Sequence, residues 1–121
     1  MAVILFIDDD LGSRVLYEKA CTLLGHQSLL AESGERGIAI ALADQPDLIL
    51  LDFSLPDLDG LAVLTRLKEE YSTARIPVVI VSAGISEQES QVTHEAGAVA
   101  FLNKPIGLNE LQQTIHQFSV A

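Results

Sequence analysis

The sequence has little of several residue types, and each shortage excludes something. It has no tryptophan, and 5% aromatic residues, so a core must come mainly from Leu, Ile, Val and Ala. The one cysteine, Cys21, excludes an internal disulfide bond and is interpreted as a small buried apolar group. Lysine and arginine number 7 against 17 aspartates and glutamates, and the net charge of -10 argues against direct nucleic-acid binding.

Long apolar runs are also missing. No stretch approaches the roughly 20 residues that span a bilayer, and Met1-Ala2 leads into an apolar run without the basic region of a signal peptide. We therefore expect a cytoplasmic protein that does not insert into membranes. The length suits one domain over residues 1–121, in which 49% hydrophobic residues can form a core.

Short apolar runs alternate with amphipathic stretches along the whole chain. Five such units predict an α/β fold in which a parallel sheet carries helices on both faces. We expect the doubly wound, flavodoxin-like (βα)5 arrangement with strand order 2-1-3-4-5. The predicted strands are Val3–Ile7, Gln27–Ala31, Leu48–Leu51, Val78–Val81 and Val99–Leu102.

The stretches between the strands have apolar residues at helical spacing, which predicts the core-facing positions of each helix. In the first, Gly25 is the expected helix stop. The predicted core-facing residues are Leu16, Ala20, Leu23 and Leu24 in the first helix, Ile38, Ala41 and Leu42 in the second, Leu61, Leu64, Leu67 and Tyr71 in the third, and Leu108, Leu111, Ile115 and Phe118 in the fifth.

The fourth predicted helix differs from the others. Ser86 and Glu89 form a capping-box pattern at its start, and Gly97 is a plausible stop. The pattern places only Val92 and Ala96 toward the core, so we expect this helix to be the least firmly packed. Such a helix can be one that shifts in function, or simply one that is well solvated.

Acidic residues follow two of the predicted strands. Asp8, Asp9 and Asp10 come directly after the first strand, and Asp52 comes directly after the third. In the expected topology these strands are neighbours, and ligands of open α/β sheets bind outside the carboxyl ends of the strands. Like charges gathered there are costly unless a cation lies among them. The pattern predicts a Mg²⁺ site with an aspartate available as a nucleophile.

The chain resembles the receiver domain of two-component response regulators over essentially its whole length. Each matching motif is weak alone, but their order and their places at strand ends make the set specific. The matching segments are the acidic pair Asp8-Asp9, Asp52 within residues 51–60, Ser82 within residues 81–83, and Asn103-Lys104-Pro105.

The resemblance implies a role for each matching residue. Asp52 would accept a phosphoryl group, Lys104 would pair with the phosphoryl oxygens, and Ser82 would donate a hydrogen bond to one of them. Mg²⁺ would be bound directly by Asp9, by Asp52 and by the backbone carbonyl of Ser54, and through water by Asp8. A cis peptide bond before Pro105 and a switch role for Phe101, where the family more often has Tyr, complete the implied site.

The resemblance also implies partners. A sensor histidine kinase or histidine phosphotransfer protein would supply the phosphoryl group in a phosphorelay. A changed surface on the fourth helix, fifth strand and fifth helix would then bind a downstream protein, and many receivers form dimers there once phosphorylated. The chain would catalyse its own phosphorylation and dephosphorylation and no metabolic reaction.

Other interpretations of these residues remain open. Asp10 is expected to cap the first helix, Asp57 or Asp59 the third, and Phe101 could be ordinary core. A phosphatase of the haloacid dehalogenase kind would use Asp8 as its nucleophile, although Leu11-Gly12 departs from that family's motif. A purely structural adaptor of receiver-like fold is the third alternative, disfavoured because the acidic pair, acceptor and lysine are all present.

Overall fold

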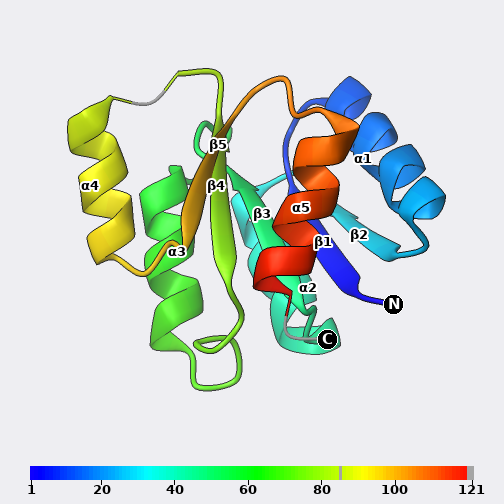
Figure 1. Ribbon diagram of the computed structural model, residues 1–121. Coiled ribbons are helices and arrows are strands. Elements are labelled where there is room, and N and C mark those ends of the chain that lie inside the picture. The colour runs from blue at the N-terminus through cyan, green and yellow to red at the C-terminus, as the bar shows by residue number, and fades with distance from the viewer. Residues whose placement is uncertain (85, 120–121) are drawn as a thin grey trace.

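The computed structural model describes residues 1–84 and 86–119. In this part of the chain five strands alternate with five helices (Figure 1). The elements are β1 (Val3–Ile7), α1 (Leu11–Leu24), β2 (Gln27–Ala31), α2 (Gly34–Asp44), β3 (Leu48–Asp52), α3 (Gly60–Glu69), β4 (Val78–Ser82), α4 (Glu87–Glu95), β5 (Ala100–Asn103) and α5 (Leu108–Phe118).

The strands form one parallel sheet in the order β2-β1-β3-β4-β5, which confirms the predicted fold. Helices α1 and α5 cover one face, and α2, α3 and α4 cover the other (Figure 1). The chain reverses its direction of winding between β1 and β3. Such a switch point leaves a crevice at the carboxyl ends of the two strands.

Two apolar clusters, one on each face, hold the sheet between its helices. Strands β1, β3 and β4 contribute to both, because alternate side chains of a strand point to opposite faces. The central strand β3 is buried along its whole length, as expected for a parallel strand covered on both sides. A sheet buried on both faces therefore underlies the edge at which the acidic residues lie.

The strands end slightly later than predicted. Asp52 and Ser82 are the last residues of β3 and β4, because Asp52 pairs with Val81 and Ser82 pairs with Asn103. β5 begins at Ala100 and not at Val99. The acceptor candidate is thus part of the sheet itself.

The core-facing positions predicted for α1 are partly wrong. Leu16 and Leu23 are 68% and 77% exposed, whereas Tyr17 packs against the core and Cys21 is fully buried. The apolar stripe of α1 is wider than the face that contacts the sheet, and the two leucines lie on its outer side. The stripe therefore leaves an apolar surface on this side of the molecule.

Three further predicted core residues are exposed. Tyr71 lies beyond the end of α3 and is 88% exposed, and Leu42 and Leu108 lie at the margins of their helices. The other predicted positions of α2, α3 and α5 are buried or half-buried; they are Ile38, Ala41, Leu61, Leu64, Leu67, Leu111, Ile115 and Phe118.

Helix α4 has the weak core contact expected of it, although not through the expected residue. Val92 is 42% exposed, and the buried side chain of the helix is Thr93, whose hydroxyl donates to backbone carbonyls of the preceding turn. Ala96 packs against the core as predicted. The capping box of Ser86 and Glu89 is present. Helix α4 therefore forms from local bonds more than from tertiary packing.

None of the helices in residues 1–84 and 86–119 is long and apolar enough to cross a membrane.

Candidate functional site

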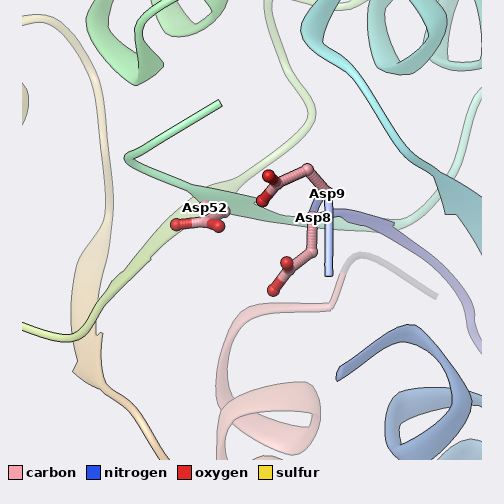
Figure 2. A group of neighbouring side chains, drawn as sticks. All are labelled: Asp8, Asp9 and Asp52. Atoms are coloured by element: carbon pink, nitrogen blue, oxygen red, sulfur yellow. The ribbon is translucent and has the colours of Figure 1, made fainter. Parts of the chain in front are cut away.

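Strand pairing brings the two acidic segments together. Ile7 of β1 lies opposite Leu51 of β3, so the next residues, Asp8 just after β1 and Asp52 at the end of β3, lie side by side. Asp8 is 2% exposed and Asp52 is 7% exposed, whereas Asp9 is open to solvent. Carboxylate oxygens of the three lie within 4.8 Å of one another (Figure 2). The predicted acidic cluster is present.

Lys104 completes the cluster from the end of β5. Its Nζ lies 2.8 Å from Oδ2 of Asp8 and 3.3 Å from Oδ2 of Asp52. The backbone N–H of Lys104 donates to the carbonyl of Ser82 at 2.9 Å, and the Lys104-Pro105 peptide bond is cis, as expected. A single ammonium group thus bridges two buried carboxylates from two other strands.

The electrostatics of the cluster show a surplus of negative charge. Burial raises the pKa of Asp52, and the charge of Asp8 adds to the increase, while the N–H of Ser54 and the ammonium of Lys104 act against it. Burial alone would lower the pKa of Lys104, but its hydrogen bond to Asp8 and the charges of Asp52 and Asp8 raise it above its ordinary value. The ammonium of Lys104 contacts two of the three carboxylates, so negative charge remains in excess and the donor set suits a further cation that prefers oxygen.

Two neighbours fix Asp8 in place. Its Oδ1 accepts the N–H of Asp10 at 2.9 Å, and its backbone carbonyl accepts a hydrogen bond from Nη1 of Arg14 at 2.8 Å. Asp10 caps α1 as predicted, since it accepts the N–H of Ser13. The sequence interpretation missed Arg14; its place one helical turn after Asp10 was the available signal.

Comparison with known proteins identifies this arrangement. A family model described as the response regulator receiver domain matches residues 4–116. The chain belongs to the response regulator receiver domain family. The protein PilH of Pseudomonas aeruginosa is 34% identical over 96% of both chains. Sporulation initiation phosphotransferase F of Bacillus subtilis is 30% identical over 95% of this chain and 91% of that one.

Solved structures agree with this assignment. The chemotaxis protein CheY4 of Vibrio cholerae has the same fold, with a TM-score of 0.92 and 22% identity over 98% of both chains. The receiver domain of a sensor histidine kinase from Pseudomonas aeruginosa PAO1 has a TM-score of 0.88 and 25% identity over 97% of this chain and 96% of that one. That crystal structure has a magnesium ion coordinated in its active site cleft.

The receiver domain places the two predicted switch residues differently. Ser82 ends β4, next to β3, and its hydroxyl lies 3.2 Å from the carbonyl of Gly84 and not against the carboxylates. Phe101 is half-buried on β5 and packs against the core on the α2, α3 and α4 face. The predicted core packing of Phe101 is therefore present in this state, and its switch role stays a prediction.

The receiver domain also has an apolar groove that the sequence did not reveal. It runs between α1 and the start of α5, has a volume of about 550 Å³, and reaches Lys104 at the carboxyl edge of the sheet. The exposed leucines of α1, predicted to be core, lie here. The lining side chains include Leu16, Tyr17, Leu23, Lys104, Ile106 and Leu108.

Proposed function

We propose that this receiver domain is a phosphoacceptor switch in which Asp52 takes a phosphoryl group from a phosphohistidine. The observation that carries the proposal is the bridge of Lys104 between Asp8 and Asp52 within a cluster of three carboxylates. It provides a buried nucleophile, a cation for the phosphoryl oxygens and further acidic ligands at one edge of the sheet.

The proposed step is a direct phosphoryl transfer. A carboxylate oxygen of Asp52 bonds to phosphorus, the phosphorus–nitrogen bond of the phosphohistidine breaks, and its electron pair stays on the imidazole nitrogen. The product is an acyl phosphate. Lys104 exchanges its contact with Asp52 for one with the phosphoryl oxygens, so positive charge stays beside the added negative charge. Asp52 needs no general base, because a carboxylate is already ionised at neutral pH.

The three carboxylates of Asp8, Asp9 and Asp52 fit Mg²⁺ in this reaction, and the backbone carbonyl of Ser54 would be a further oxygen ligand. The fit rests on the oxygen donors and on the surplus of negative charge beside Lys104. The magnesium site of the structurally similar kinase receiver domain gives further support. When bound, Mg²⁺ would neutralise charge on the phosphoryl group and help to align it.

The contacts of the two buried aspartates favour Asp52 over Asp8 as the nucleophile. Both oxygens of Asp8 are engaged at short range, by Lys104 at 2.8 Å and by the N–H of Asp10 at 2.9 Å. The contacts of Asp52 are longer, 3.3 Å to Lys104 and 3.2 Å to the N–H of Ser54. Asp52 is thus easier to release for attack, and the phosphatase alternative, which requires Asp8, is disfavoured.

Phosphorylation would act on the weakly packed side of the fold. About two added negative charges at Asp52 would draw the hydroxyl of Ser82 from Gly84 toward the phosphoryl group. Phe101 would then pack further inward, and the surface of α4, β5 and α5 would change. We propose that this surface binds the downstream protein, or a second phosphorylated copy of the chain.

We propose that the phosphodonor, a sensor histidine kinase or histidine phosphotransfer protein, docks a helix in the groove between α1 and α5. The groove is apolar and reaches Lys104, so a protein seated in it brings its histidine close to Asp52. Leu16→Asp and Leu23→Asp should slow phosphorylation by a kinase that phosphorylates the wild type, but not by acetyl phosphate. Equal rates with both donors would remove the groove from this role.

We further propose that residues 1–121 act as one receiver domain in the cytoplasm, where kinases draw on ATP. Fractionation of cells that express the full chain would test the location. Recovery of the chain outside the cytoplasmic fraction would contradict it.

The phosphoacceptor proposal is tested by incubating the full chain with Mg²⁺ and acetyl phosphate and measuring intact mass. We expect the wild type to gain one phosphoryl group and Asp52→Asn to gain none. The control Asp10→Asn should be labelled like the wild type, because Asn also serves as a helix N-cap. Label that persists in Asp52→Asn would refute the assignment, and its loss in Asp8→Asn alone would favour the phosphatase alternative.

A further inference from the structure

The start of α2 is capped by a residue from a distant loop. Three backbone N–H groups there have acceptors outside the helix. Ser33 accepts the N–H of Arg36 at 3.2 Å, which is an ordinary local cap. The N–H groups of Gly34 and Glu35 donate to Oδ1 and Oδ2 of Asp57 at 2.9 and 3.0 Å. Both oxygens of this one carboxylate are therefore used to join α2 to the β3–α3 loop.

The loop that supplies Asp57 also carries part of the proposed metal site. Asp57 lies five residues after Asp52 and three after Ser54. A backbone carbonyl such as that of Ser54 has no side-chain torsions with which to find a ligand, so its position depends on the whole loop. Whatever holds this loop therefore sets the position of the Ser54 carbonyl.

Packing supports the same junction from the side of α2. A Cβ added at Gly34 would lie 2.7 Å from Cγ2 of Val63 and 3.2 Å from Cβ of Leu58, so the start of α2 presses directly against the loop and α3. The N–H groups of Glu35 and Gly34 lower the pKa of Asp57, which therefore stays charged at neutral pH. Its charge also faces the positive end of the α2 dipole.

We propose that Asp57 is a positioning residue for Mg²⁺ binding: by bonding to the start of α2 it holds the β3–α3 loop so that the carbonyl of Ser54 faces the carboxylate cluster. The inference builds on the proposed function. Without the bond, the loop would have to be ordered on binding, and that entropy cost would weaken metal affinity. Loss of residues that orient metal ligands typically weakens affinity about 10- to 100-fold.

The matched comparison is Asp57→Ala against Ser33→Ala. Each removes capping from the same end of α2, but only the first releases the β3–α3 loop. We expect Asp57→Ala to raise the Kd for Mg²⁺, measured by calorimetry on the full chain, about tenfold. Ser33→Ala should leave the Kd unchanged.

Phosphorylation of Asp57→Ala by acetyl phosphate should recover at saturating Mg²⁺. Asp57→Asn, which keeps one acceptor oxygen, should fall between Asp57→Ala and the wild type.

Hydrogen exchange supplies a second measurement that needs no metal. Exchange of the backbone amides in residues 53–59 should become faster in Asp57→Ala and stay unchanged in Ser33→Ala. Wild-type Mg²⁺ affinity in Asp57→Ala would overturn the inference, as would an equal loss in Ser33→Ala, since the effect would then pass through helix stability. If the wild type binds no Mg²⁺, the proposed function fails, and the exchange data still decide whether Asp57 holds the loop.

Discussion

The β3–α3 loop and the β4–α4 loop leave the same edge of the sheet but are held in different ways. The first has long-range partners: Asp57 bonds to the start of α2, and Leu55 and Leu58 pack against the core. Gly60 donates its N–H to the carbonyl of Phe53, which closes the base of the loop. Helix α3, which follows, buries Val63, Leu64 and Leu67 completely.

The described part of the β4–α4 loop has local bonds instead. The hydroxyl of Ser82 contacts Gly84 two residues later, and the capping box of Ser86 and Glu89 lies within the first turn of α4. The buried residue of α4 is Thr93, whose hydroxyl bonds within its own helix. The described bonds of this loop and of Thr93 in α4 therefore join residues that are close in sequence.

The difference suggests that the β3–α3 loop and the β4–α4 loop have different roles at the site. The firmly held loop follows the proposed acceptor Asp52 at the end of β3 and carries the proposed ligand Ser54, whose geometry would have to be ready before phosphorylation. The locally bonded loop follows Ser82 at the end of β4, whose hydroxyl would have to turn toward the phosphoryl group in the proposed switch. Elements with little buried apolar surface open at low free-energy cost, so the second loop and α4 are the part best suited to shift.

The largest expected effect contrasts the two helices that follow these loops. Leu64→Ala removes a fully buried side chain of α3 and should lower the free energy of unfolding by about 2–5 kcal/mol. Val92→Ala removes a 42% exposed side chain of α4 and should change it by less than about 0.5 kcal/mol. Urea denaturation followed by circular dichroism measures both, and similar losses would show that α4 is packed as firmly as α3.

The next effect concerns Lys104, which contacts both regions. Its side chain pairs with Asp52 and Asp8, and its backbone N–H bonds to the carbonyl of Ser82. Lys104→Ala leaves two buried carboxylates without their cation and should lower the free energy of unfolding on the order of 2 kcal/mol without Mg²⁺. Millimolar Mg²⁺ should restore more stability to this variant than to the wild type. A Mg²⁺ effect equal to that of the wild type would contradict the shared role.

The same variant tests how the signal passes between the regions. Lys104→Ala should still accept a phosphoryl group from acetyl phosphate, because Asp52 is unchanged. The change in backbone hydrogen exchange of α4 on phosphorylation should shrink, since no ammonium group then joins the phosphoryl oxygens to β5. A wild-type exchange response would remove Lys104 from the switch.

The sequence predicted the parts of this site that follow from topology. Once five βα units are recognised, strand order alone places Asp8, Asp52 and Lys104 at one edge, so their meeting could be expected without coordinates. The contact of Asp57 could not. The sequence indicated that Asp57 or Asp59 caps α3; Asp59 does so, and Asp57 caps α2, 22 to 23 residues away. Nothing local to either segment encodes that contact.

The exposed leucines of α1 show a second limit. Helical spacing identifies an apolar stripe but not how wide its buried part is. The exposed residues Leu16 and Leu23 lie on the same stripe as Tyr17 and Cys21, which contact the core. A helix face that is buried in the core and one that lines a surface groove have the same sequence pattern. Only the packing of α5 beside α1 decides which residues remain open.

The last comparison sets Gly60, the first residue of α3, against Gly84 in the β4–α4 loop. A Cβ at Gly60 would lie 2.8 Å from Cα of Phe53, so Gly60→Ala must shift the backbone next to Asp52 and should lower the free energy of unfolding by about 1–3 kcal/mol. A Cβ at Gly84 would meet no atom within 4 Å among the described residues, and its φ lies outside the left-handed region. Gly84→Ala should therefore be neutral, or stabilise by up to about 1 kcal/mol by restricting the unfolded chain.

Thermal unfolding of the two variants beside the wild type measures this difference. The same two variants also separate effects on fold stability from effects on Mg²⁺ binding and on the response to phosphorylation. Gly60→Ala should also weaken Mg²⁺ binding, because it displaces the loop that carries Ser54, whereas Gly84→Ala should leave Mg²⁺ binding intact and slow the response of α4 to phosphorylation. If Gly84→Ala destabilised the fold as much as Gly60→Ala, the β4–α4 loop would be as tightly packed as its neighbour. The contrast between a fixed and a movable half of the site would then fail.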